Sequence, residues 1–188
     1  MHQLKTTPNA HRAARLSTRH MVLAALFAAL LAVFSQLAIP MVPVPMNLAL
    51  LAVFLCALVL EPRWALISVG LYLLMGVLGL PVFSGFRGGP SVLFGPTGGY
   101  LLGYLLAAAV ISLLIPLADH YAKRILVLVA ALLACYLPGT LWLMMLTGRG
   151  FGEALPLAVY PFLPGDAIKI ILAAFIAPRM VQMLKRIY

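Results

Sequence analysis

Long apolar runs, separated by short polar or glycine- and proline-rich turns, fill most of this sequence. The first run would measure roughly 28 Å as a helix at ~1.5 Å per residue, close to the ~30 Å thickness of a bilayer core. The pattern therefore predicts an all-α integral membrane protein with six transmembrane helices. The expected spans are residues 21–39, 47–60, 64–80, 97–117, 125–147 and 166–180.

Three segments between these spans interrupt the helical pattern. Residues 40–46 contain three prolines, which predict an extended connector. Residues 81–103 are rich in glycine and proline, and irregular backbone in a membrane protein is tolerated only where protein covers it or where it lines a cavity. Residues 147–165 predict a second irregular loop, and the pair Pro138–Gly139 predicts a break in the fifth span.

Small residues recur every fourth position in two spans, a spacing that lets helices pack closely. The stripe in the first span consists of Ala24, Ala28 and Ala32. The stripe at the fourth span consists of Gly95, Gly99, Gly103 and Ala107. For the alanine stripe the sequence leaves two packing partners open, a helix of this chain or a helix of another subunit.

The composition narrows the class of protein. Of 188 residues, 64% are hydrophobic and 9% are charged, whereas soluble domains have about 25% charged residues. The chain fits a single membrane domain, residues 21–182, without a separate soluble domain. Cys56 and Cys135 lie inside apolar runs, and the four histidines lie outside the apolar centres. We therefore expect no metal site, no cofactor and no enzymatic pairing of a nucleophile with a base.

The distribution of lysine and arginine predicts the orientation of the spans. With the N-terminus inside, ten of the thirteen fall in cytoplasmic segments, Arg87 and Arg149 fall outside, and Lys169 lies within the sixth span. This asymmetry follows the positive-inside rule, so we expect cytoplasmic segments at residues 1–20 and 183–188. It also accounts for the net charge of +9 without nucleic acid as a partner. The ten lysine and arginine residues expected on the cytoplasmic side are Lys5, Arg12, Arg15, Arg19, Arg63, Lys123, Arg124, Arg179, Lys185 and Arg186.

Charged residues near the outer ends of the spans are the candidates for ligand binding. Asp166 and Lys169 are three residues apart and would share one helix face. At the centre of a span each would cost about 2.5–3.5 kcal/mol, so an intramembrane charge is a functional candidate. The alternative is that the two pair with each other and Asp166 caps the helix. Arg87 is either a ligand-binding cation or a solvated loop residue.

A second group of candidates surrounds these charges. Each aromatic residue at this end is either a ligand contact or a membrane-interface residue. These residues are Phe83, Phe86, Tyr100, Trp142, Tyr160 and Phe162. Asn47 could cap the second span, and Thr97 the fourth. A carboxylate seeks N–H donors, and lysine and arginine seek an anion or a carbonyl. The candidates together suggest a small ligand with a ureido or amide-like head and a carboxylate tail.

Several motifs, taken together, resemble one known family. PVPMNLALLAVFL, GLPVFSGFRGGPSVLFGPTGGYLLGY and YPFLPGDAIKIILAA, in this order and spacing, resemble the BioY family across residues 21–182. Members of that family are the biotin-specific substrate-binding (S) subunits of energy-coupling factor (ECF) transporters. The resemblance implies an S-component bundle of six helices in a prokaryotic cell membrane, with a biotin pocket at the outer side. It also implies a transmembrane coupling subunit and a pair of ATPase subunits as partners, since this chain has no Walker-type phosphate loop.

The resemblance also implies roles for individual residues. Asp166 would accept hydrogen bonds from the ureido group of biotin, and Lys169 would donate to the ligand. Thr97 and Tyr100 would line the pocket, and Asn47 stands where the family often has threonine. The alanine stripe resembles the face that S subunits offer to the coupling subunit. The pairing of Arg87 with the biotin carboxylate is inferred from the charge of arginine and not from the family resemblance.

Two other functions remain open at this point. The chain could be an S subunit for another small vitamin, which the same architecture would allow. It could also be an intramembrane enzyme, although no suitable nucleophile and base appear in the spans. Whether the ligand is biotin or another vitamin, we expect residues 40–46 and 81–95 to act as a lid over the pocket.

Overall fold

The computed structural model describes residues 18–187, so most of the predicted N-terminal segment 1–20 and the final residue of the tail lie outside the described chain. The helices are α1 (Thr18–Gln36), α2 (Ala49–Val59), α3 (Pro62–Val77), α4 (Pro90–Leu93), α5 (Gly98–Leu114), a 3-10 turn η1 (Ile115–Leu117), α6 (Tyr121–Thr147), α7 (Phe151–Ala158) and α8 (Leu163–Ile187). Two short antiparallel strands, β1 (Ala38–Ile39) and β2 (Met46–Asn47), flank the proline-rich connector.

The mostly helical architecture confirms the predicted class. Among the described residues, four helical stretches are long and apolar enough to cross a membrane: α1, α5 with η1, α6, and most of α8. Helices α2 and α3 are also apolar but have only 11 and 16 residues, which correspond to roughly 16 and 24 Å. Many large apolar side chains remain exposed on the bundle surface, as expected where lipid is the solvent.

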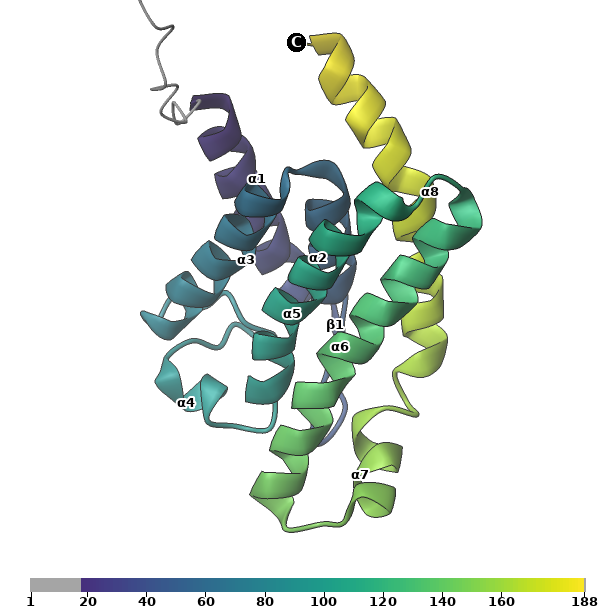
Figure 1. Cartoon of the computed structure of the whole chain (residues 1–188). Helices are drawn as coiled ribbons and strands as arrows, with labels where there is room; N and C mark the ends of the chain where they lie inside the picture. The colour runs from purple at the N-terminus through teal and green to yellow at the C-terminus, as the bar shows by residue number, and fades with distance from the viewer. Residues whose placement is uncertain (1–17, 188) are drawn as a thin grey trace, which may run out of the picture.

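Figure 1 shows how the elements are arranged along the bundle. The first turn of α1, the turn between α5 and α6, and the end of α8 lie at one end, whereas α4 and α7 lie at the opposite end. Contacts support the grouping at the first end: His20 of α1 lies 3.6 Å from Glu61 before α3, and Arg19 donates to the carbonyl oxygen of Leu184 in α8. The loops with irregular backbone thus lie together, away from the described chain ends.

Two of the predicted irregular segments are more helical than expected. Helix α6 continues through Pro138, because bilayer-embedded helices tolerate proline where neighbouring groups satisfy the freed backbone. The predicted loop 147–165 contains α7, whose first turn closes onto the carbonyl oxygen of Gly150. Helix α8 begins at Leu163 and therefore includes the Pro-Gly pair that was expected to precede it.

Helices α5 and α6 pack closely through the glycine stripe. A Cβ atom added at Gly103 would lie 2.6 Å from the carbonyl oxygen of Cys135. A Cβ atom added at Gly99 would lie 2.4 Å from the carbonyl oxygen of Pro138. Ala107, one turn further, is fully buried. These contacts confirm the stripe from Gly99 onward, whereas Gly95 precedes the helix.

The alanine stripe of α1 mostly faces the inside of this chain. Ala24 and Ala28 are buried, and the hydroxyl of Ser68 in α3 donates to the Ala24 carbonyl oxygen at 2.8 Å. Of the two packing partners that the sequence left open, the structure shows the face of Ala24 and Ala28 covered by this chain, with α3 beside Ala24. Ala32 is half-buried and also packs against the core of this chain.

Candidate ligand-binding site

A cavity lies among the β-hairpin, the loop before α4, and helices α5, α6 and α8. Its volume is about 60 Å³. The lining residues are Ser35, Val44, Pro45, Met46, Asn47, Leu50, Phe83, Ser84, Arg87, Val92, Thr97, Tyr100, Leu101, Tyr104, Cys135, Tyr136, Phe162, Asp166 and Lys169. An apolar enclosure with a few convergent polar groups is the usual form of a small-ligand site.

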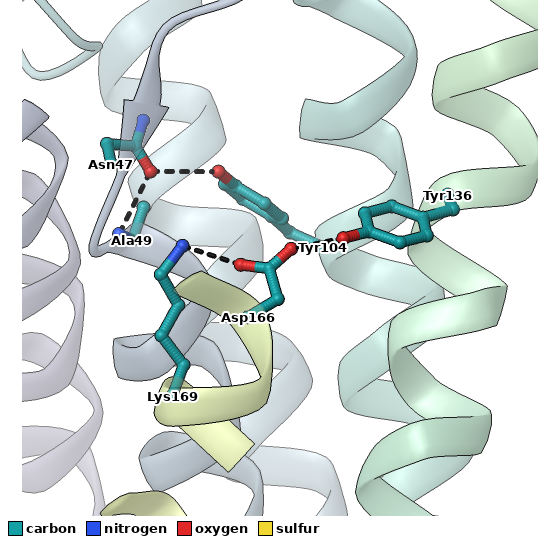
Figure 2. Close-up of polar contacts among 6 residues, drawn as sticks. All are labelled: Asn47, Ala49, Tyr104, Tyr136, Asp166 and Lys169. Carbon is teal, nitrogen blue, oxygen red and sulfur yellow. Dashed lines mark hydrogen bonds and ion pairs between the residues drawn. The ribbon is translucent and has the colours of Figure 1, made fainter. Parts of the chain in front are cut away.

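An ion pair between Asp166 and Lys169 supplies the charge in the cavity wall. Both side chains come from the beginning of α8 and are only 3% and 5% exposed. The Lys169 ammonium donates to one carboxylate oxygen of Asp166 at 2.6 Å, and the Tyr136 hydroxyl of α6 donates to the other at 2.5 Å (Figure 2). The buried charges therefore stabilise each other and have a hydrogen-bonded neighbour.

The sequence left two interpretations of this pair open: ligand binding, or mutual pairing with Asp166 as a helix cap. The structure bears on the capping and the pairing. Asp166 lies inside the first turn of α8 and is not its N-cap, since its own amide donates to the carbonyl oxygen of Phe162. The pairing of Asp166 with Lys169 is present. Pairing and ligand binding are compatible, because a carboxylate offers about four lone-pair sites and the contacts described use two.

Asn47 and Tyr104 form a second polar group across the cavity. The Tyr104 hydroxyl of α5 donates to the side-chain oxygen of Asn47 at 3.4 Å, and the same oxygen accepts from the Ala49 amide at 3.0 Å (Figure 2). Asn47 thus satisfies a free amide at the start of α2, as predicted for a cap, although Leu48 occupies the N-cap position itself. This bond holds the end of β2 at the cavity.

Thr97 and Tyr100 lie at the beginning of α5, where the glycine-rich loop enters the helix. The Tyr100 hydroxyl donates to the carbonyl oxygen of Ala158 at 2.7 Å and so ties α5 to the end of α7. Thr97 occupies the predicted N-cap position, but its hydroxyl points back to the carbonyl oxygen of Val92 at 3.4 Å and makes no capping bond. Both residues line the cavity.

Arg87 lies at the exposed edge of the cavity. Its guanidinium Nε donates to the carbonyl oxygen of Ser84 at 3.1 Å. The backbone of Arg87 pairs with that of Phe83 in an antiparallel bridge, and Gly85 supplies the positive φ that this tight turn requires. Arg87 is therefore a cavity-lining cation whose side chain is bonded to Ser84 of the same loop.

Gln36, which the sequence reasoning missed, fastens this loop to α1. Its side-chain amide donates to the carbonyl oxygens of Val82 and Phe83 at 3.1 and 3.2 Å, and its oxygen accepts from the Phe86 amide at 2.9 Å. Phe86 is held there at φ 55°, an unusual conformation for a non-glycine residue. A lone glutamine at the end of an apolar run was the only signal for this role.

Replacing Gln36 by methionine should loosen the loop. The variant removes the donor and the acceptor but keeps the length of the side chain, and each net hydrogen bond contributes about 1 kcal/mol. We expect amide hydrogen exchange in residues 82–88 to accelerate by roughly ten-fold or more, measured by mass spectrometry. Gln182→Met changes an exposed glutamine of α8 in the same way and should leave the loop unaffected. Equal exchange in both variants would contradict the fastening role.

Three predicted ligand contacts lie outside the cavity lining. Phe86 is 73% exposed because the turn that Gln36 holds directs it away, and Tyr160 is 56% exposed after α7. Trp142 is half-buried and its indole donates to the carbonyl oxygen of Gly95 at 3.0 Å, so it supports the loop from α6. In this structure the three do not line the cavity, whereas the other six predicted residues do.

Two tyrosines were missed as lining residues. Tyr104 and Tyr136 both lie within apolar helices and point their hydroxyls at polar groups of the cavity. A tyrosine within a predicted span was the available signal, because a buried hydroxyl needs a partner. Among residues 18–187, no three His, Cys, Asp or Glu side chains gather to hold a metal ion.

Comparisons with known proteins agree with this geometry. The model of the BioY family matches residues 6–186. The chain is 40% identical to the "Biotin transporter BioY" of Thermotoga maritima, over 86% of this chain and 95% of that protein. It is 36% identical to the "Probable biotin transporter BioY" of Pyrococcus horikoshii, over 88% and 98%.

A solved structure shares the fold. The crystal structure of the S-component for biotin from an ECF-type ABC transporter superposes with a TM-score of 0.79 at 28% sequence identity, covering 87% of this chain and 91% of that one. The family match covers nearly the whole chain, and both relatives align over almost their full length. This chain therefore belongs to the BioY family.

Proposed function

We propose that this protein captures biotin at the outer face of a prokaryotic cell membrane and serves as the S subunit of an ECF-type transporter. The names of its relatives support biotin as the ligand. The observation that carries the proposal is the buried Asp166–Lys169 pair in a cavity with otherwise mostly apolar or uncharged walls. The chain itself would transport without catalysing a reaction.

The chemistry of biotin suggests a role for each part of the cavity. Its ureido N–H groups would donate to Asp166, and its ureido oxygen would accept from Lys169. The sulfur-containing ring and aliphatic tail would contact apolar residues such as Phe83 and Leu101, and the carboxylate would reach Arg87 at the exposed edge. Each assignment matches a donor with an acceptor or an apolar group with an apolar wall.

Entry of biotin requires the cavity to expand. Its volume of about 60 Å³ is well below the ~300–1,000 Å³ typical of ligand pockets. Residues 40–46 and 81–95 border it and contain the least regular backbone near it, so we propose that they open and close as a lid. The bonds of Gln36 to the second segment would set its closed position.

The proposed orientation has six spans with both termini in the cytoplasm. Basic residues gather at the end of the bundle formed by the start of α6 and the end of α8, where Arg124 and Lys185 line one cavity. Arg87 and Arg149 belong to the loops at the opposite end, which would face outward. Helices α2 and α3 would complete the six spans, with neighbouring helices compensating for their short length.

A coupling subunit and two ATPase subunits would complete the transporter. Because Ala24 and Ala28 are buried within this chain, a coupling subunit that docks on α1 would contact its other face instead. That face includes the exposed residues Val22, Ala25, Leu26, Ala29 and Val33. Energy for release would come from the ATPase subunits.

Binding to the purified chain tests the proposal directly. Radiolabelled biotin should bind the protein in detergent stoichiometrically and without ATP. In a thermal-shift panel of vitamins, biotin should give the largest rise in melting temperature. A larger shift with another vitamin would favour the alternative of an S subunit for that compound.

Replacing Arg87 by glutamine should weaken biotin binding by about ten-fold, which corresponds to ~1.4 kcal/mol. The loss should disappear for biotin methyl ester, because the ester lacks the carboxylate that Arg87 would bind. Arg149→Gln, in the exposed loop after α6, removes the same charge and should leave both affinities unchanged. Equal loss for acid and ester would show that Arg87 does not read the carboxylate.

A further inference from the structure

A second cavity lies at the end of the bundle opposite the ligand site. Its volume is about 350 Å³, and it lies among α2, η1, α6 and α8. Two cations from different helices line it, Arg124 of α6 and Lys185 of α8, together with the amide of Gln182. No acidic side chain is among its lining residues.

Within the described part of the chain, the two cations have no counter-ion of their own. Neither Arg124 nor Lys185 makes a side-chain hydrogen bond or ion pair with any residue in the range 18–187. Asp119, the acid next in sequence to the wall residue Ala118, is engaged by Lys123 at 2.6 Å and by His120 at 3.6 Å. Two unpaired positive charges in one concave surface favour an anion.

An apolar groove borders this cavity. It has a volume of about 250 Å³, and Ala118 belongs to the walls of both the cavity and the groove. Leucines make up three of its six lining residues, and the others are Ala118, Val127 and Lys123, whose ammonium is engaged by Asp119. Leu117 and Leu126 are 70% and 65% exposed on the surface that faces lipid in the proposed arrangement. A basic cavity joined to an apolar groove complements a molecule with an anionic head and a hydrocarbon chain.

We propose that this site binds one anionic phospholipid. Its phosphate would lie between Arg124 and Lys185, with Gln182 as a further donor, and an acyl chain would lie along Leu117 and Leu126. Basic pockets between helices at the cytoplasmic side commonly bind anionic lipid headgroups. The groove distinguishes a lipid from a free phosphate, since inorganic phosphate would leave its apolar walls without a partner. The site is independent of the biotin pocket, so either assignment can fail alone.

Native mass spectrometry of the full chain in detergent tests the site. The probes are phosphatidylglycerol, phosphatidylcholine and inorganic phosphate. We expect one phosphatidylglycerol to bind preferentially, and the double variant Arg124→Gln/Lys185→Gln to bind it on the order of 30-fold more weakly, from roughly five-fold for each cation. Retained biotin binding by this variant would show that it is folded.

The control is the double variant Arg63→Gln/Arg186→Gln. It removes two positive charges on the same proposed cytoplasmic side, and neither residue lines this cavity. Unchanged phosphatidylglycerol binding in the control supports a defined site. Equal weakening in both double variants would overturn it in favour of diffuse attraction. Equal binding of phosphatidylcholine, or full displacement of phosphatidylglycerol by equimolar inorganic phosphate, would also overturn the proposal.

Discussion

Replacing Asp166 by asparagine should weaken biotin binding strongly. The change keeps the shape of the side chain but leaves the buried Lys169 ammonium without its counter-ion and weakens the acceptor for Tyr136. Removing one partner of a buried charge pair costs about 2–5 kcal/mol, which corresponds to an affinity loss of roughly 30-fold to several thousand-fold. Titration of the purified variant with radiolabelled biotin measures the loss.

Glu153→Gln is the matched control for Asp166→Asn. Glu153 lies in α7, near the same end of the bundle, and is exposed, so its replacement changes the net charge equally without touching the cavity. We expect unchanged affinity. If Asp166→Asn bound biotin as tightly as the control, the site assignment would be wrong.

The double variant Asp166→Asn/Lys169→Met separates ligand binding from internal neutralisation. Replacing a buried ion pair by neutral groups of similar volume is often neutral or stabilising, so the melting temperature should recover relative to Asp166→Asn. Biotin binding should not recover, since both proposed partners of the ureido group are gone. Recovery of stability and binding together would mean that the pair only neutralises itself.

Gly103→Val should have the largest effect on folding. Its Cβ would lie 2.6 Å from the Cys135 carbonyl oxygen, so α5 and α6 must move apart. Overpacking of this kind costs about 1–3 kcal/mol, and a contact with backbone, which cannot rotate away, places this variant near the upper value. Because Tyr136 follows Cys135 in α6, the displacement should weaken biotin binding as well. Thermal unfolding in detergent and biotin titration measure the two effects.

Gly70→Val in α3 controls for the introduction of valine into a helix. A Cβ at Gly70 meets no atom within 4 Å, so the substitution has room. Valine also has a higher helix propensity than glycine. We expect no loss of melting temperature. Comparable destabilisation by both variants would show that the close approach of α5 and α6 is not the cause.

The local chemistry of the site was predictable from the sequence. Asp166 and Lys169 were conspicuous because charges in an apolar run are costly, and their spacing places them on one helix face. The stripe of Gly99 and Gly103 was predictable from its four-residue repeat. Gln36 and Tyr136 were not, because each is a single polar residue whose partners lie far away in sequence.

The sequence by itself determined the membrane class, the helical content and the charged pair of the site, since composition, run length and local spacing carry this information. Only the tertiary structure decided that Ala24 and Ala28 are buried within this chain, that α6 continues through Pro138, and that Phe86 lies outside the cavity. The physical reason is that helices in lipid are apolar on nearly all sides. Their sequences therefore do not distinguish the face that meets a neighbouring helix from the face that meets the membrane.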